Sequence, residues 1–169
     1  MPRRYYKRPR FNKDKYSVEQ TIIRTTDTSD WTPVETNEQI SYQVNYPVVP
    51  AVDTQGMRKV KHFQLTFTNG SAANSYAEPI YYALVYVPGG YTPNNLNLGP
   101  PGLPFAAYEP NQYVLSQGWL DFDGGPLRIN TPLSRNLNSG DAIGLVLGCF
   151  SQAVGVRYNI SVRFAITLQ

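Results

Sequence analysis

The sequence predicts an all-β, eight-stranded antiparallel jelly-roll sandwich with a basic N-terminal arm. Several segments of the 169-residue chain alternate between apolar and polar residues, and turn-forming sequences such as DGGP and NLNSGD separate them. Such alternation places successive side chains on opposite faces of a strand. The fourteen prolines, thirteen glycines and thirteen tyrosines also favour strands and turns over helices.

Residues 1–16 are the predicted arm, and residues 17–169 are the predicted folded domain. The first fifteen residues, MPRRYYKRPRFNKDK, contain seven Lys or Arg and one Asp. The rest of the chain has eight basic and eleven acidic residues, so its net charge is −3, whereas the whole chain carries +3. Positive charge concentrated in one segment indicates a polyanionic partner. The arm has too few apolar residues to fold alone.

The strand signal is strongest at the C-terminus, where every even-numbered residue from Val156 to Leu168 is apolar and the residues between are polar or small. The segments IYYALVYV and AIGLVLGCF are apolar on both faces. This is typical of strands that the core or a neighbouring subunit covers on both sides. The predicted strands span residues 17–26, 39–48, 59–68, 80–87, 113–122, 127–131, 142–150 and 156–168.

Eight antiparallel strands in one domain fit a jelly roll of two four-stranded sheets. An immunoglobulin-like sandwich is the alternative, but it is usually nearer 100 residues long and has a Cys…Trp…Cys spacing. This chain has one cysteine, Cys149. Residues 88–112 are rich in proline and glycine and are predicted to form a long loop, and loops of that length are usually functional.

The basic residues of the domain fall mostly in four strands. In a jelly roll, the first, third, sixth and eighth strands form one sheet, so the sequence predicts a basic outer face on that sheet. However, Lys61 has the same parity as Phe63 and Leu65. Either a bulge or a later strand start brings the lysines to the outer face, or they are strand-end charges. The basic residues assigned to this sheet are Arg24, Arg58, Lys59, Lys61, Arg128, Arg157 and Arg163, while Arg135 is assigned to the loop before the seventh strand.

No catalytic arrangement emerges from the sequence. The single histidine, His62, lies on the polar parity of a strand, and Cys149 has the apolar surroundings of a core thiol. Asp121 and Asp123 are interpreted as a strand end before a Gly-Gly turn, because a calcium loop needs further oxygen ligands. Asp141 in NSGD is likewise interpreted as a turn residue. We therefore predict a protein that is not an enzyme and has no metal or cofactor.

The start MPRRYYKRPR, the strand pattern and the stretch TPLSRNLNSGDAIGLVL together resemble the capsid proteins of circovirus-like viruses, which have small circular single-stranded DNA genomes. Residues 135–143 have the pattern R-x-L-x-x-G-D-x-I. The resemblance implies a virion protein of which about sixty copies form a T=1 icosahedral shell. It also implies that the arms project inward to the genome, and that assembly takes place in the host nucleus.

The arm has the composition expected for binding single-stranded nucleic acid, and the resemblance implies that DNA is preferred over RNA. Lys and Arg would neutralise phosphates, and aromatic side chains would stack on unpaired bases. The same composition fits a nuclear-import signal, so an import receptor is a further expected partner. The predicted nucleic-acid-binding residues are Arg3, Arg4, Tyr5, Tyr6, Lys7, Arg8, Arg10, Phe11, Lys13, Lys15, Arg24, Arg128, Arg157 and Arg163.

Aromatic residues in and beside the 88–112 loop are predicted to form contacts between subunits, because aromatics are enriched at interfaces. The alternative is that they pack on the domain's own core. The candidates are Tyr91, Phe105, Tyr108 and Tyr113.

Three other functions stay open: a coat of a small satellite-type RNA virus, a jelly-roll binding module for ligands such as sugars, and a cellular nucleic-acid protein without a shell. Membrane insertion is not expected, since no apolar run approaches the roughly 20 residues that span a bilayer. Pro2 and Pro9 also interrupt any amphipathic helix in the arm.

Overall fold

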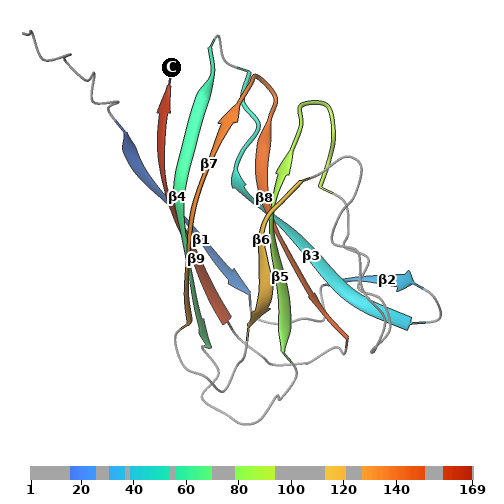
Figure 1. Cartoon of the computed structure of the whole chain (residues 1–169). Coiled ribbons are helices and arrows are strands. Elements are labelled where there is room, and N and C mark those ends of the chain that lie inside the picture. The colour runs from blue at the N-terminus through green and yellow to red at the C-terminus, as the bar shows by residue number, and fades with distance from the viewer. Residues whose placement is uncertain are drawn as a thin grey trace, which may run out of the picture.

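The computed structural model contains two antiparallel β-sheets (Figure 1). The four-stranded sheet has the order β1 (Ser17–Thr25), β9 (Tyr158–Leu168), β4 (Arg58–Asn69) and β7 (Leu127–Leu137). The five-stranded sheet has the order β2 (Thr32–Thr36), β3 (Gln39–Val49), β8 (Ala142–Cys149), β5 (Ile80–Val87) and β6 (Tyr113–Leu120). The structure describes residues 16–25, 31–36, 39–53, 56–69, 79–93, 113–120, 127–150 and 158–168.

The order of the strands confirms the predicted jelly roll. Once β2 is set aside, the first, eighth, third and sixth predicted strands form one sheet, and the second, seventh, fourth and fifth form the other. β2 was not predicted. It pairs with β3 at the outer edge of its sheet. Its five residues include Pro33, which makes the sequence look like a loop, but an edge strand accommodates a proline.

The prediction that the sixth strand ends at residue 131 was wrong, and so was the placement of Arg135 in the following loop. β7 continues to Leu137, and Arg135 pairs with Val60 of β4. Pro132 would normally end a strand because it lacks an N–H. Here it falls where the register between β4 and β7 shifts, at the edge of the sheet, so the strand continues past it.

A β-bulge at His62 interrupts β4. The register with β7 shifts between Lys61 and Phe63, and the register with β9 shifts between Lys61 and Gln64. His62 has φ 56°, the only positive φ at a non-glycine residue in the described part of the chain. A bulge adds one residue to a strand and inverts the alternation that follows. Val60 and Phe63 are therefore both buried, which confirms the bulge alternative for the lysines of this strand.

The main core lies between the two sheets and is rich in aromatic residues. Phe63 and Phe164 have ring centroids 5.7 Å apart, and Trp31 packs edge-on against Tyr158 at 6.0 Å. A second apolar cluster lies on the other face of the five-stranded sheet, so every residue of β5 is buried. The apolar faces of β5 and β8 are thus covered within one chain, without a neighbouring subunit. The second cluster comprises Tyr81, Ala83, Val85, Val87 and Val146.

Candidate nucleic-acid interface

The outer face of the four-stranded sheet carries five basic side chains, and we call it the basic face. Ile23 of β1 pairs with Ile160 of β9, and both are buried. Residues one position away on each strand therefore point outward. The outward basic residues are Arg24 on β1, Lys59 and Lys61 on β4, Arg128 on β7 and Arg163 on β9.

Amide, hydroxyl and apolar side chains fill the rest of the basic face, and the apolar ones include Val18 and Ile22 of β1. Arg163 lies opposite Gln20 on one side and opposite Gln64 on the other. In the next row, Thr66 lies between Ser161 and Arg128. These side chains supply the hydrogen-bonding groups that bind phosphate and sugar oxygens in protein–nucleic acid complexes.

No carboxylate of the four strands lies on the basic face. Their one acidic residue is Glu19, which has the inward parity of Ile23. The strands of the other sheet contain no Lys or Arg. Among the strand residues, positive charge is therefore confined to the four-stranded sheet. Arg58 and Arg135 share the inward parity of Val60, so the assignment of Arg58 to the outer face was wrong, and Arg58 is buried instead. The other five cations lie on the outer side, where no acidic strand residue offsets them.

The chain enters β1 from the side of the basic face. Tyr16 is the residue next to the predicted arm, and Lys61 Nζ lies 3.4 Å from the centroid of its ring. This is a close cation–π contact. The contact joins residues on either side of β9 and passes over Ala165, which points outward and pairs with Lys61. The contact holds the attachment point of the arm against the basic face.

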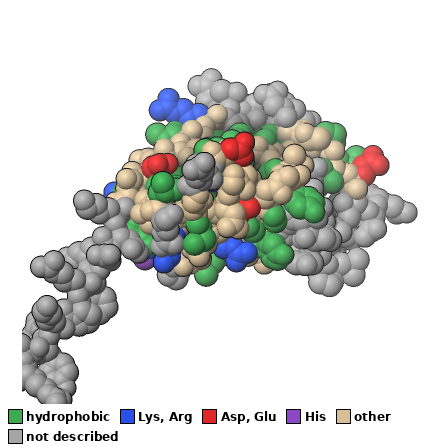
Figure 2. Space-filling model, turned by 90° about the horizontal axis from the view of Figure 1, so that it is seen from above, with side chains coloured by type: hydrophobic (Ala, Val, Ile, Leu, Met, Phe, Trp, Pro, Cys, Tyr) green, Lys and Arg blue, Asp and Glu red, His purple; other side chains and the backbone are tan. Residues whose placement is uncertain are grey.

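Figure 2 looks onto the end of the sandwich at which β7 runs into β8 (Figure 1). On this end, basic and acidic side chains both appear, interspersed with hydrophobic and other side chains. Charge is mixed here, in contrast to the single sign found on the strands of the basic face.

The structure brings together three of the predicted nucleic-acid-binding residues, Arg24, Arg128 and Arg163, on one exposed face. Sequence reasoning placed Lys59 and Lys61 on the same sheet but omitted them from the predicted binding residues because of their parity. The following predicted binding residues lie outside the described part of the chain: Arg3, Arg4, Tyr5, Tyr6, Lys7, Arg8, Arg10, Phe11, Lys13, Lys15 and Arg157.

Two of the predicted interface residues are described. Tyr91 is 56% exposed and Tyr113 is 44% exposed, so both side chains lie at the surface of the single chain. Tyr113 also packs on its own subunit, with its centroid 5.8 Å from that of Tyr86. Phe105 and Tyr108 lie outside the described residues.

A polar network joins the end of β5 to the turn between β7 and β8. The Asp141 carboxylate accepts hydrogen bonds from the Tyr86 hydroxyl at 2.8 Å and from the backbone N–H groups of Gly89 at 2.8 Å and Asn138 at 2.7 Å. Arg58 donates from Nη2 to the backbone oxygen of Asp141 at 2.8 Å. Asp141 is therefore a turn residue, as predicted, and it also connects the two sheets.

This network shifts two pKa values. Burial is the main cause that raises the pKa of Tyr86 to about 12, and the hydrogen bond to Asp141 adds to it. Burial opposes the charged form of Asp141, but the hydrogen bonds from Asn138, Tyr86 and Gly89 outweigh it, so the pKa of Asp141 is lowered. Asp141 is thus an ionised hydrogen-bond acceptor near neutral pH.

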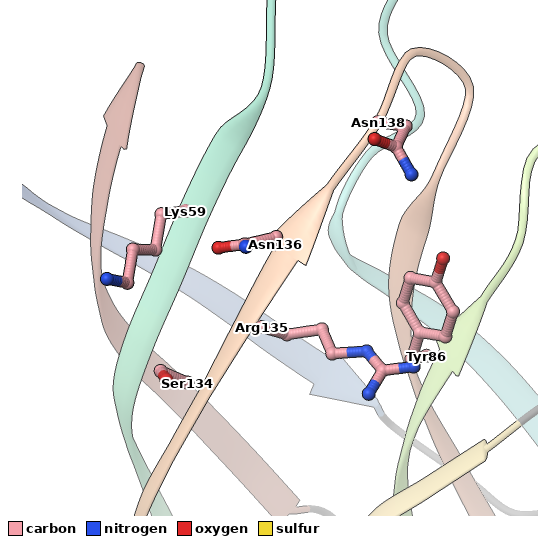
Figure 3. A pocket seen from close by; sticks show the side chains of 6 residues that line it. All are labelled: Lys59, Tyr86, Ser134, Arg135, Asn136 and Asn138. Atoms are coloured by element: carbon pink, nitrogen blue, oxygen red, sulfur yellow. The ribbon is translucent and has the colours of Figure 1, made fainter. Parts of the chain in front are cut away.

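A polar pocket of about 490 Å³ opens beside this network (Figure 3). Arg135 reaches from β7 toward Tyr86 of β5, and the amide of Asn136 points toward β4, where Lys59 lies (Figure 3). The guanidinium carbon of Arg135 lies 4.4 Å from the Tyr86 centroid and 5.5 Å from the Tyr113 centroid. The lining residues are Lys59, Tyr86, Ser134, Arg135, Asn136 and Asn138.

The described residues contain no group of three or more His, Cys, Asp or Glu that could hold a metal ion. Cys149 is buried, with Sγ 3.8 Å from the backbone oxygen of Tyr42, as predicted for a core thiol. His62 is exposed at the bulge. Asp121 and Asp123 lie outside the described residues. Within the described segments, no helix is long and apolar enough to cross a membrane.

Neither protein-family models nor curated proteins match this sequence. Among solved structures, VP1 of Trichodysplasia spinulosa-associated polyomavirus, in complex with GM1 oligosaccharide, is 9% identical with a TM-score of 0.29, covering 90% of this chain and 96% of that chain. The VP2 subviral particle of infectious bursal disease virus is 8% identical with a TM-score of 0.24, covering 89% of this chain and 41% of that chain. The strand order of this chain is what identifies its fold as a jelly roll.

Proposed function

We propose that this protein is the capsid subunit of a small icosahedral virus and that it packages single-stranded nucleic acid through its arm and its basic face. The observation that carries the proposal is the basic face itself. It has five cations and no carboxylate among its strand residues, and Tyr16 holds the start of the arm against it.

The arm and the basic face together would act as one electrostatic surface. The arm supplies seven basic residues and the face supplies five, twelve in all for each subunit. Such residues bind phosphates with little regard to sequence, and they release counterions when they do so. Tyr5, Tyr6 and Phe11 suit unpaired bases, on which aromatic rings stack, and this favours a single strand over a duplex.

Exposed apolar side chains on the edge strands of both sheets support assembly into a shell. Leu133 of β7 is 44% exposed, and Trp119 of β6 is 43% exposed. Large exposed apolar side chains are typical of surfaces that bind another protein. Subunits packed side by side would cover them, together with Tyr91.

The first test is the mass of the purified protein by light scattering, with absorbance recorded at 260 and 280 nm. A shell of about sixty copies of 19.0 kDa has a mass near 1,140 kDa. A particle of that mass with raised absorbance at 260 nm is expected. A chain that stays a monomer or small oligomer at all salt concentrations, and with single-stranded DNA added, would overturn the capsid proposal.

The same test separates the capsid from a cellular nucleic-acid protein, which would bind single-stranded DNA as a monomer or dimer in a salt-sensitive manner.

We propose DNA as the packaged nucleic acid. Digestion of the extracted nucleic acid with DNase or RNase tests this directly. Nuclear import through the arm is a further part of the proposal, and removal of residues 1–15 from a fluorescent fusion tests it in cells.

A further inference from the structure

We propose that the polar pocket between β7 and β5 binds one nucleotide of the packaged strand, so that each subunit holds a phosphate and its base in a fixed position. This inference rests on the proposed function and deepens it. The arm and the basic face bind a strand without a defined register, whereas the pocket would fix one nucleotide for each subunit.

The pocket contains two cations that are free to bind an anion. Within the described part of the chain, neither Lys59 nor Arg135 has a hydrogen-bond or ion-pair partner, and no acidic side chain lines the pocket. The nearby carboxylate of Asp141 already accepts three hydrogen bonds. Arg135 is not one of the donors to this carboxylate.

Tyrosine rings orient Arg135. Its guanidinium carbon lies 4.4 Å from the centroid of Tyr86 and 5.5 Å from that of Tyr113, so both rings lie within cation–π range of the cation. Tyr86 is itself held by the hydrogen bond to Asp141. The N–H donors of a guanidinium form a planar fork that matches two oxygens of a phosphate.

The pocket continues the basic face. Lys59 pairs with Asn136 across β4 and β7, and Lys61 pairs with Ser134 in the next outward row. Lys59, Asn136 and Ser134 therefore belong to both surfaces. A strand that lies on the basic face reaches the pocket without crossing a carboxylate of the four strands.

The amide groups of the pocket favour a nucleotide over a bare phosphate. Asn136 offers a donor and an acceptor, the combination that pairs with the edge of a base. Asn138, whose side chain also hydrogen-bonds to Asp141, adds a second amide. A volume of about 490 Å³ lies within the range typical of small-ligand sites and leaves room beside the phosphate. Inorganic phosphate alone would leave these amides unused.

Binding of 5′-phosphorylated deoxytrinucleotides to the full chain, followed by calorimetry, tests this inference. We expect about one bound trinucleotide per subunit. Arg135→Lys should weaken binding about tenfold because lysine lacks the planar fork, and Lys59→Gln should weaken it by a similar factor. Asn138→Ala should change the order of affinity among trinucleotides of different bases.

Glu35→Gln is the charge control, since it changes one charge on the exposed surface of β2, in the other sheet and outside both the pocket and the basic face. We expect it to change trinucleotide affinity by less than about twofold. Circular dichroism melting of each variant separates loss of the site from loss of the fold.

Three results would overturn the inference: no trinucleotide binding by the wild-type chain, equal affinity in Arg135→Lys and the wild type, or equal affinity for inorganic phosphate or a sulfated disaccharide. Its failure differs from failure of the proposed function. If the pocket is not used, long single-stranded DNA is still packaged into particles. If the capsid proposal is wrong, trinucleotides bind but no particle forms.

Discussion

The Tyr86 hydroxyl donates a 2.8 Å hydrogen bond to Oδ2 of Asp141, and the same tyrosine ring lies under the guanidinium of Arg135. Arg135 and Asp141 belong to one short sequence pattern, R-x-L-x-x-G-D-x-I. In the structure both residues contact the side chain of Tyr86, which lies in β5. β7 belongs to the four-stranded sheet and β5 to the five-stranded sheet, so Tyr86 connects the two sheets at this end of the sandwich.

Loss of the Asp141 carboxylate should destabilise the fold. Asp141→Ala removes the acceptor for two backbone N–H groups and for the Tyr86 hydroxyl, and it leaves these donors buried or half-buried without a partner. We expect the free energy of unfolding, measured in urea on dissociated subunits, to fall by about 3 kcal/mol. Asp53→Asn is the control, since Asp53 is exposed and only accepts a 3.4 Å bond from Ser139, and a change within about 0.5 kcal/mol is expected.

Stability should also depend on pH through Asp141. Its pKa in the folded protein is lowered from 3.8, so folding favours the ionised carboxylate. The stabilisation is therefore fully present above pH 3.8 and is lost as pH falls through the lower folded value. In Asp141→Asn this acid loss should be reduced, which denaturation of wild type and variant between about pH 2 and pH 6 measures. If the free energy of unfolding falls by the same amount with decreasing pH in both proteins, Asp141 is not the group responsible.

The alternation of residues predicted most of the fold, since seven of the eight predicted strands match observed strands closely. It gave the bulge at His62 only as one of several alternatives, because alternation within one strand does not reveal register shifts against two neighbours. Nor could it place Arg135 on Tyr86 and Tyr113, because these residues are far apart in the chain and no repeat relates them. Arg24, Arg128 and Arg163 were found because the jelly-roll strand order places their three strands in one sheet.

The backbone at His62 offers a test of the bulge. A left-handed conformation costs a non-glycine residue about 1 kcal/mol, and a β-branched residue more. His62→Gly should therefore increase the free energy of unfolding by up to about 1 kcal/mol, whereas His62→Val should reduce it. Deletion of His62 should reduce it far more, since without the bulge Lys59 and Lys61 would take the parity of the core. A deletion variant as stable as the wild type would rule out the bulge.

Salt dependence tests the basic face independently of shell assembly. Each phosphate contact that is lost should reduce the slope of log K against log salt concentration by about 0.7 for a single strand. We expect this change for Arg163→Gln, measured by fluorescence anisotropy with a labelled single-stranded DNA. Glu35→Gln, on the exposed surface of β2 in the other sheet, is the control and should leave the slope unchanged. An unchanged slope in Arg163→Gln would remove this side chain from the interface.

Substitution of Tyr91 tests the predicted contacts between subunits. Its ring is 56% exposed, and the bond from its backbone N–H to the oxygen of Pro88, at 3.2 Å, does not depend on the side chain. Tyr91→Ser should therefore leave the melting temperature of dissociated subunits nearly unchanged while it shifts the light-scattering mass from particle to small oligomer. Val52→Ser, at an exposed apolar residue that was not predicted to form a contact, is the control and should still assemble. Particles of full mass from Tyr91→Ser would place the contact elsewhere, and the exposed edge residues Leu133 and Trp119 would then be the next positions to substitute.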